Sequence, residues 1–380
     1  MPNIQPFKIE VSDAVLKDLR ERLERTRFPD EVPDTGWEYG TNLAYMEELV
    51  EYWRTKYDWR RHEAALNRFD HFKTNLGGLD LHFIHAKGRG PNPKPLLLSH
   101  GWPGTIYEFM EIIPMLTNPG AHGADPAHSF DVVAPSLPGY GFSGHPQVRA
   151  TNIQAIADMF HWLMTATLGY SRYCAQGGDW GSAITSRLGE VHGDSLYGIH
   201  VNLLFVGGRT KREGELSSEE KVFLADLDHF RREETGYQQI QGTKPQTLAY
   251  GLNDSPAGLA AWIVEKFRTW SDCGGDLNRR FTKDQLLTNV MIYWITQTIN
   301  SSIRLYYESR HHPWRPDPAK RIETPTAAAL FPGEILKPPR QWAEEAFNIQ
   351  RWTVMPRGGH FAAMEEPRLL ADDIRAFFWR

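Results

Sequence analysis

Short apolar runs of strand length alternate with stretches of helical periodicity, and this alternation limits the folds that are open to the chain. The strand patterns occupy Pro95 to Ser99, Phe130 to Pro135 and Ser171 to Gly177, and the helical patterns occupy about Thr105 to Leu116 and Asn152 to Leu168. Strands that alternate with helices predict a parallel sheet whose two faces are both covered. We therefore expect an α/β fold with a mostly parallel sheet flanked by helices.

This alternation is interrupted once and then resumes. From Gly207 to about Lys320 the sequence is polar, rich in aromatic residues and mostly helix-like. Strand patterns return at Thr324 to Phe331 and at Gln350 to Met355, and Pro367 opens a last amphipathic helix. The interruption predicts a helical lid inserted into a single sheet domain. In such a layout ligands bind between the lid and the carboxyl ends of the strands.

Helical spacing also marks the first seventy residues, where apolar side chains recur from Val15 to Leu23 and again from Met46 to Tyr57. We expect these helices to wrap another part of the molecule. The predicted division is an N-terminal helical segment that leads into the first strands (residues 1–92), the first part of the core (93–206), the lid (207–320) and the second part of the core (321–380).

The charge and cysteine content restrict the partners and the compartment. The 380 residues carry 42 basic and 47 acidic side chains, a net charge of −5, which leaves no excess positive field for nucleic acid or an anionic membrane. Cys174 and Cys273 lack the CxxC spacing of metal or redox sites. The sequence shows neither a signal-peptide pattern nor about 18 consecutive apolar residues. We expect a cytoplasmic protein without a membrane anchor.

The sharpest local motif joins a strand pattern to a helix pattern through Gly177-Gly178-Asp179-Trp180-Gly181. This is the nucleophile-elbow arrangement G-x-Nu-x-G, with an aspartate in the place of the nucleophile. The turn is too tight for β-carbons on the flanking residues, so glycine is required there. The motif taken alone is equally consistent with an aspartate that caps a helix in a glycine-rich turn.

Two further residues complete a possible triad. His360 follows the last strand pattern in Gly358-Gly359-His360-Phe361, and Glu334 follows the preceding one. Nucleophile, acid and base then occur in the chain order of this architecture. The loop after Pro95 to Ser99 carries His100-Gly101-Trp102-Pro103, so the backbone N–H groups of Trp102 and Trp180 are the expected oxyanion-hole donors. Each residue by itself would pass for an ordinary loop residue.

With these motifs in place, the sequence resembles the epoxide hydrolases of the microsomal type, including their soluble bacterial and fungal relatives, which have the α/β-hydrolase fold. The likeness covers nearly the whole chain. Its motifs are His100-Gly101-Trp102-Pro103, Pro138-Gly139-Tyr140-Gly141-Phe142-Ser143, Gly177-Gly178-Asp179-Trp180-Gly181, Glu234-Thr235-Gly236-Tyr237, Ser301-Ser302-Ile303-Arg304-Leu305-Tyr306 and Gly358-Gly359-His360-Phe361. The resemblance implies Asp179 as nucleophile, His360 as base, Glu334 as its acid partner, and Tyr237 and Tyr306 as acids on the lid.

The residue types suit that reaction. A carboxylate that attacks an epoxide leaves an ester whose carbonyl belongs to the enzyme, and water can then cleave it. Phenolic hydroxyls can protonate the opening ring, and no metal or organic cofactor is needed. We expect an apolar epoxide and water as substrates, and the resemblance implies a homodimer. Two alternatives stay open: a hydrolytic dehalogenase, in which the Trp180 indole would hold the halide, and a ligand-binding receptor that keeps the fold without turnover.

Overall fold

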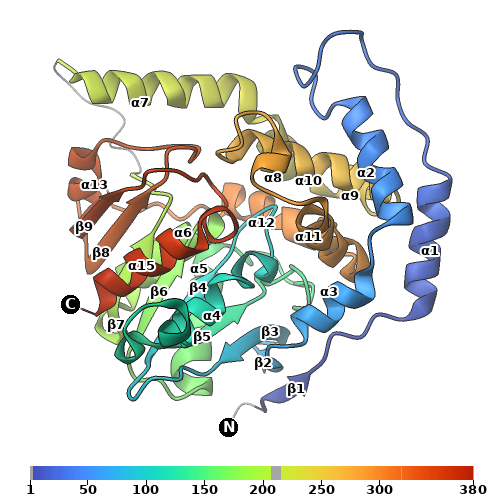
Figure 1. Cartoon of the computed structure of the whole chain (residues 1–380). Helices are drawn as coiled ribbons and strands as arrows, with labels where there is room; N and C mark the ends of the chain where they lie inside the picture. Colours follow the sequence, from blue (N-terminus) through green and yellow to red (C-terminus); the bar gives the residue numbers. More distant parts are fainter. Residues whose placement is uncertain (1–2, 207–214, 318, 380) are drawn as a thin grey trace.

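A nine-stranded sheet forms the centre of the computed structural model, which describes residues 3–206, 215–317 and 319–379. The strand order is β1-β2-β3-β5-β4-β6-β7-β8-β9 (Figure 1). The strands are β1 (Gln5–Phe7), β2 (His71–Leu76), β3 (Leu79–Ala86), β4 (Lys94–Ser99), β5 (Phe130–Pro135), β6 (Tyr173–Gly177), β7 (Leu196–Val201), β8 (Ile322–Leu330) and β9 (Phe347–Val354).

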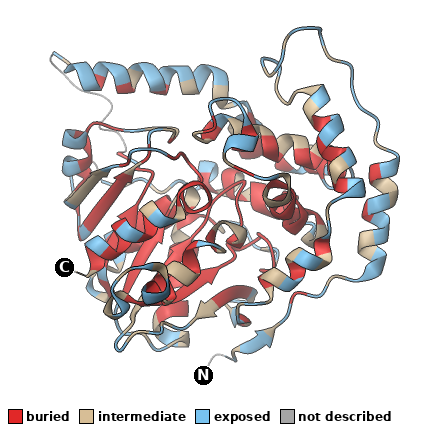
Figure 2. Ribbon diagram, viewed as in Figure 1, coloured by how far each residue is buried: buried red, intermediate tan, exposed pale blue. Residues whose placement is uncertain are grey.

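The sheet has an antiparallel edge and a parallel body. Strands β1, β2, β3 and β5 pair antiparallel, whereas β5, β4, β6, β7, β8 and β9 pair parallel. Every residue of β5 and β6 is buried, as expected of parallel strands that helices cover on both faces. Figure 2 shows the central strands as an almost continuous buried layer. The predicted α/β fold with a mostly parallel sheet is confirmed.

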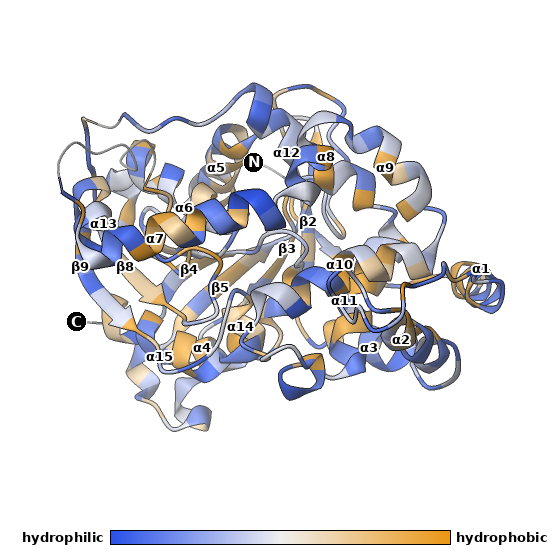
Figure 3. Cartoon of the chain, turned by 90° about the horizontal axis from the view of Figure 1, so that it is seen from above, coloured by the Kyte–Doolittle hydropathy of each residue, from blue (hydrophilic) through white to orange (hydrophobic). Residues whose placement is uncertain are grey.

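Two pairs of helices cover the faces of the sheet. Helix α4 (Ile112–Thr117) packs against α15 (Pro367–Phe378), and α5 (Ile153–Trp162) packs against α6 (Trp180–Val191). The pairs lie on opposite sides of the strands (Figure 1). Helix α15 presents its apolar side chains, including Leu370, Ile374 and Phe377, to the core. Figure 3 shows the same division, with apolar colour concentrated toward the sheet and polar colour on the outside.

The described residues between β7 and β8 contain helices and no strand. The α-helices there are α7 (Ser218–His229), α8 (Gly236–Thr243), α9 (Pro245–Leu252), α10 (Pro256–Trp270), α11 (Lys283–Thr296) and α12 (Ile299–His311). The predicted first residue of the lid, Gly207, lies outside the described part of the chain. None of the helices described in this structure is long and apolar enough to cross a membrane.

The N-terminal helices pack mainly on the lid. Helices α1 (Asp13–Glu24) and α2 (Leu43–Thr55) contact α10, and α2 and α3 (Trp59–Leu66) contact α11. They bury their apolar residues in this contact and run beside the lid helices in Figure 1. The predicted wrapping segment therefore holds the lid from outside.

Some local expectations were wrong. The predicted helix from Thr105 to Leu116 is two short pieces, a 3₁₀ turn at Ile106–Phe109 and α4. The N-terminal segment, expected to be helical, begins with β1, in which Pro6 pairs with Phe72. A three-residue edge strand carries too little periodicity to be predicted locally, because its partner lies about 65 residues away in the chain.

We predict opposite effects for the same glycine-to-alanine change at two helical positions. A Cβ on Gly181, in α6, would overlap the carbonyl oxygen of Ser99, whereas a Cβ on Gly251, in α9, would meet no atom within 4 Å. Gly181→Ala should destabilise the fold by about 1–3 kcal/mol through overpacking. Gly251→Ala should leave it unchanged or stabilise it by up to about 1 kcal/mol. Thermal unfolding of both variants checks this, and equal midpoints would contradict it.

Candidate active site

Asp179 stands at a sharp turn between β6 and α6. Its backbone has φ 50° and ψ −128°, a conformation that costs a non-glycine residue about 1–3 kcal/mol. A Cβ on Gly177 would overlap the carbonyl oxygen of Gly181, and one on Gly181 would overlap that of Ser99. The surrounding backbone is therefore packed too closely for any other residue at these two positions. This turn places Asp179 at the carboxyl edge of the sheet, and its carboxylate projects outward from that edge.

His360 and Glu334 meet Asp179 at that edge. The Nε2 atom of His360 lies 3.3 Å from Asp179 Oδ2, and its Nδ1 atom lies 2.6 Å from Glu334 Oε1. Glu334 follows β8 and His360 follows β9, and the segments are tied by a bridge between Gly333 and Gly359. The imidazole is thus held between two carboxylates, in the arrangement that the sequence predicted.

The charge state of His360 follows from this enclosure. Burial alone would lower the pKa of the imidazole, but the adjacent Glu334 and Asp179 carboxylates favour the cation and raise the pKa well above its ordinary value. The resting site therefore favours a protonated His360 between two anions.

Trp102 places a backbone donor on the nucleophile. Its N–H donates to Asp179 Oδ1 over 2.8 Å. The second predicted donor, Trp180, is the first residue of α6, where N–H groups have no partner within the helix. His100 is engaged elsewhere: its Nδ1 lies 3.0 Å from Gly101 O and its Nε2 accepts from the Leu137 N–H. Burial lowers the pKa of His100 to about 4, so it is a neutral structural residue.

The two predicted lid tyrosines lie together over this group. Tyr237 in α8 and Tyr306 in α12 are both buried, with ring centroids 5.7 Å apart. Tyr237 stacks on Trp102 at 5.3 Å, and Tyr306 meets the Trp180 ring edge-on at 4.8 Å. Burial raises the pKa of both phenols above the ordinary range, which keeps them protonated. Tyr307, one residue on, instead stacks on His311 at 4.0 Å.

These residues share a cavity of about 430 Å³ between the lid and the sheet. Asp179 and Trp180 contribute to its floor, and Tyr237 and Tyr306 reach it from the lid. Its remaining walls are largely apolar and include Ile153, Leu203, Phe205, Phe230, Pro313, Trp314, Ile335 and Leu336. The cavity lies between the lid and the carboxyl ends of the strands, where the sequence analysis places the ligand site.

Several residues that position His360 were missed in the sequence. The His360 N–H donates to the carbonyl oxygen of Trp270, whose ring lies 5.2 Å from the imidazole. Glu365 accepts hydrogen bonds from the Phe361 and Asp272 N–H groups, and so ties the histidine loop to the lid. Burial raises the pKa of Glu365 to about 7. Trp270 and Asp272 belong to no local motif, because their role depends on contacts about 90 residues away along the chain.

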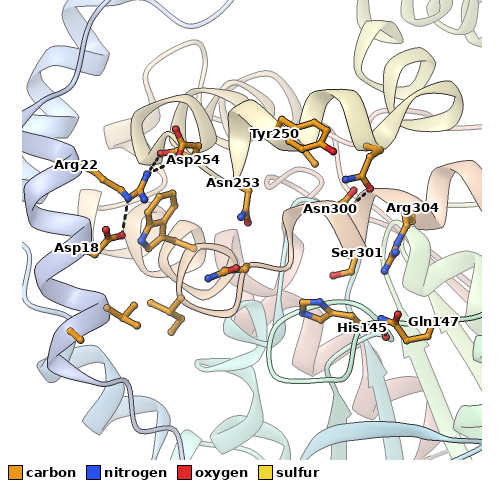
Figure 4. A pocket seen from close by; sticks show the side chains of 17 residues that line it. Asp18, Arg22, His145, Gln147, Tyr250, Asn253, Asp254, Asn300, Ser301 and Arg304 are labelled. Atoms are coloured by element: carbon orange, nitrogen blue, oxygen red, sulfur yellow. Dashed lines mark hydrogen bonds and ion pairs between the residues drawn. The ribbon is translucent and has the colours of Figure 1, made fainter.

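A larger polar cavity of about 830 Å³ lies apart from this site, between α1, α9 and α12 (Figure 4). At one end Arg22 bonds to Asp18 and Asp254, and at the other Arg304 lies beside His145. None of the predicted site residues lines it. The smaller, apolar cavity, by contrast, is lined by Asp179, Trp180, Tyr237 and Tyr306.

Comparison with known proteins identifies the family. Residues 4–109 match the model described as epoxide hydrolase N terminus, and residues 94–201 match that of the alpha/beta hydrolase fold. The chain is 42% identical over 410 residues to epoxide hydrolase 1 of Sus scrofa, with 99% of this chain and 88% of that protein covered. This chain belongs to the epoxide hydrolase family.

Solved structures agree with that assignment. The juvenile hormone epoxide hydrolase of the silkworm Bombyx mori has a TM-score of 0.91 and 34% identity, covering 100% of this chain and 95% of that one. The epoxide hydrolase of Aspergillus niger has a TM-score of 0.87 and 31% identity, covering 99% and 96%. The α/β-hydrolase fold is confirmed, and the protein is an epoxide hydrolase. The comparisons thus favour this enzyme over the dehalogenase and the receptor.

We predict that Glu334→Gln lowers the pKa of His360, because it removes one of the two anions that stabilise the buried imidazolium. Histidine side-chain NMR across a pH titration measures this, and His360→Gln assigns the resonance. Glu323→Gln, at an exposed residue, is the control and should leave the titration unchanged. An unshifted titration in Glu334→Gln would contradict the electrostatic role given to Glu334.

Proposed function

We propose that this epoxide hydrolase opens an apolar epoxide to a vicinal diol in two steps, through a covalent ester on Asp179. One observation carries the proposal. The Asp179 carboxylate lies between the Trp102 N–H and His360, on the floor of a cavity that two buried tyrosines reach from the lid. A nucleophile and two proton donors therefore face one apolar space, and the base contacts the nucleophile beside it.

In the first step a carboxylate oxygen of Asp179 attacks an epoxide carbon, and the bond from that carbon to the ring oxygen breaks. Tyr237 and Tyr306 protonate the leaving oxygen, so that no free alkoxide forms. Their position in the cavity supports this role, as does the burial that keeps them protonated. The strained turn at Asp179 supports the nucleophilic role, because it projects the carboxylate toward the cavity.

In the second step water attacks the ester carbonyl carbon and gives a proton to His360. The N–H groups of Trp102 and Trp180 hold the tetrahedral oxyanion. The ester C–O bond then breaks, and the departing diol oxygen takes the proton from the His360 imidazolium. The second water proton returns to the tyrosinate left by the first step, which restores the Asp179 carboxylate. Esterification removes the negative charge of Asp179, which is one cause of the raised pKa of His360. The pKa of His360 therefore falls once the ester has formed, which favours the neutral imidazole that can accept a proton from water. Glu334 stabilises the cation that the imidazole then becomes.

The proposed substrate is an apolar epoxide, since aliphatic and aromatic side chains form most of the cavity wall. Both steps balance with the groups of this chain and water, so the proposal includes no metal or organic cofactor. We further propose that the enzyme works in the cytoplasm, which the two buried free thiols of Cys174 and Cys273 support. A homodimer stays a prediction.

We predict that His360→Gln traps the ester, because Asp179 can attack without a base but the ester cannot be hydrolysed without one. Intact-protein mass spectrometry with styrene oxide should show the added mass of the substrate, located on Asp179 by peptide mapping. In wild type, one turnover in ¹⁸O-water with enzyme in excess should put the label into Asp179. Label found only in the diol would mean that water attacks the epoxide directly.

We predict that Tyr237→Phe or Tyr306→Phe slows alkylation and leaves ester hydrolysis nearly unchanged, while the double variant loses turnover. A catalytic acid supplies about 10²–10⁴ in rate, and the two tyrosines share that task. Stopped-flow measurement separates the two steps. Tyr307→Phe is the matched control, since it alters the neighbouring residue that stacks on His311. Alkylation at the wild-type rate in the double variant would refute the assignment.

A further inference from the structure

The hydroxyl of Tyr237 has a hydrogen-bond partner on the next residue of the same helix. The side-chain amide nitrogen of Gln238 donates to the Tyr237 hydroxyl oxygen over 2.9 Å. Consecutive side chains of an α-helix point about 100° apart, so they do not ordinarily meet. Gln238 therefore turns back toward the phenol to make this bond. It also lines the substrate cavity together with Tyr237.

The ring of Tyr237 is held by its other neighbours. Trp102 stacks on it with the two ring planes 9° apart. The Trp270 ring lies 5.2 Å away in a tilted arrangement, and the ammonium group of the buried Lys266 lies 5.0 Å from the centroid of the Tyr237 ring. These contacts fix the plane of the phenol, but its hydroxyl hydrogen can still rotate. The bond from Gln238 restricts that rotation.

The direction of the Gln238 hydrogen bond determines what the phenol can do. A phenolic hydroxyl donates one proton and accepts hydrogen bonds on its oxygen. Because the amide N–H of Gln238 donates, it occupies the oxygen and leaves the phenol proton for another acceptor. An epoxide oxygen in the cavity is such an acceptor. A side chain that accepted from the phenol would instead compete with the substrate for this proton.

The second lid tyrosine is placed differently. Tyr307, the residue that follows Tyr306 in the chain, stacks on His311. The Tyr306 ring meets the Tyr237 ring nearly at a right angle, with the two planes 79° apart. The residue that follows in the chain therefore supports the hydroxyl of Tyr237 and not that of Tyr306. Although both phenols reach the cavity, this difference indicates unequal roles.

We propose that Gln238 is a positioning residue, which directs the Tyr237 proton toward the epoxide oxygen and stabilises the tyrosinate that remains. This inference rests on the proposed function, since it assigns the proton donor of the first step. As an Asp179 oxygen bonds to the epoxide carbon, the bond from that carbon to the ring oxygen breaks and the Tyr237 proton passes to the ring oxygen. Tyr306 donates a hydrogen bond to the same oxygen and keeps its proton. The negative charge then stays on Tyr237 until hydrolysis of the ester returns a proton.

The hydrogen bond from Gln238 strengthens as the phenol loses its proton. A bond from an N–H group to an ionised oxygen is roughly twice as strong as one to a neutral oxygen. Burial raises the pKa of Tyr237 and the Asp179 charge raises it further, whereas the bond from Gln238 lowers it. Gln238 therefore contributes more in the transition state of alkylation than in the resting enzyme. An interaction of this kind accelerates the step in which the charge develops.

The test compares alkylation and ester hydrolysis with styrene oxide in variants of Gln238, by stopped-flow and rapid-quench measurements. Gln238→Met keeps the length of the side chain and removes its donor. It should slow alkylation about 5- to 20-fold, as for the loss of one hydrogen bond to a partly charged oxygen, and leave ester hydrolysis within about twofold. Gln238→Glu should slow alkylation more, because its carboxylate accepts the phenol proton. Gln246→Met, at an exposed glutamine of α9 in the same lid, should behave as wild type.

Two tyrosine variants separate a positioning role from a structural one. In Tyr237→Phe the contact is already lost, so adding Gln238→Met should change alkylation by less than about twofold. In Tyr306→Phe the same change should slow alkylation as much as it does in the wild type. Equal slowing in both backgrounds would mean that Gln238 only shapes the cavity, and would overturn the proposal. Wild-type alkylation in Gln238→Met or in Gln238→Glu would overturn it as well. If the proposed function itself fails, the wild-type enzyme forms no ester on Asp179.

Discussion

The strained backbone at Asp179 is the constraint on which the rest of the site depends. A positive φ at an aspartate persists only where its surroundings fix it, and here β6, α6 and the carbonyl oxygen of Ser99 do so. The same close packing brings the loop after β4 against the carboxylate, so that the Trp102 N–H reaches Asp179 Oδ1. A single tight turn therefore sets both the direction of the nucleophile and the position of an oxyanion donor.

Asp179 also lines two cavities of different size. One is the apolar cavity of about 430 Å³ that the lid tyrosines reach, and the other, of about 20 Å³, is lined by His360 and Trp102 as well. His360 is held between Asp179 and Glu334, so the loss of one negative charge at the nucleophile lowers the pKa of His360. Ester formation by itself can thus convert a site organised for attack on an epoxide into one organised for attack by water.

The N-terminal segment gives the lid a second support. Helices α1, α2 and α3 contact α10 and α11, whereas β1 is joined to the sheet through β2. Apolar side chains such as Leu49 and Trp53 are buried in this layer. A lid that packs on both sides holds Tyr237 and Tyr306 in place over Asp179, as the proposed proton donation requires. The N-terminal segment therefore supports the part of the molecule that carries the proposed acids.

Local spacing in the sequence was sufficient to predict the sheet, the lid and the positions of Asp179, Glu334 and His360. The reason is that the carboxyl ends of parallel strands meet at one edge of the sheet, whatever the conformation of the loops that connect them. The edge strand β1 and the hydrogen bonds that Trp270 and Glu365 make around the His360 loop could not be predicted this way. Strand β1 and the contacts between this loop and the lid depend on segments that are distant in the chain. Periodicity shows which residues face a core, but only the packed chain decides which buried polar groups meet.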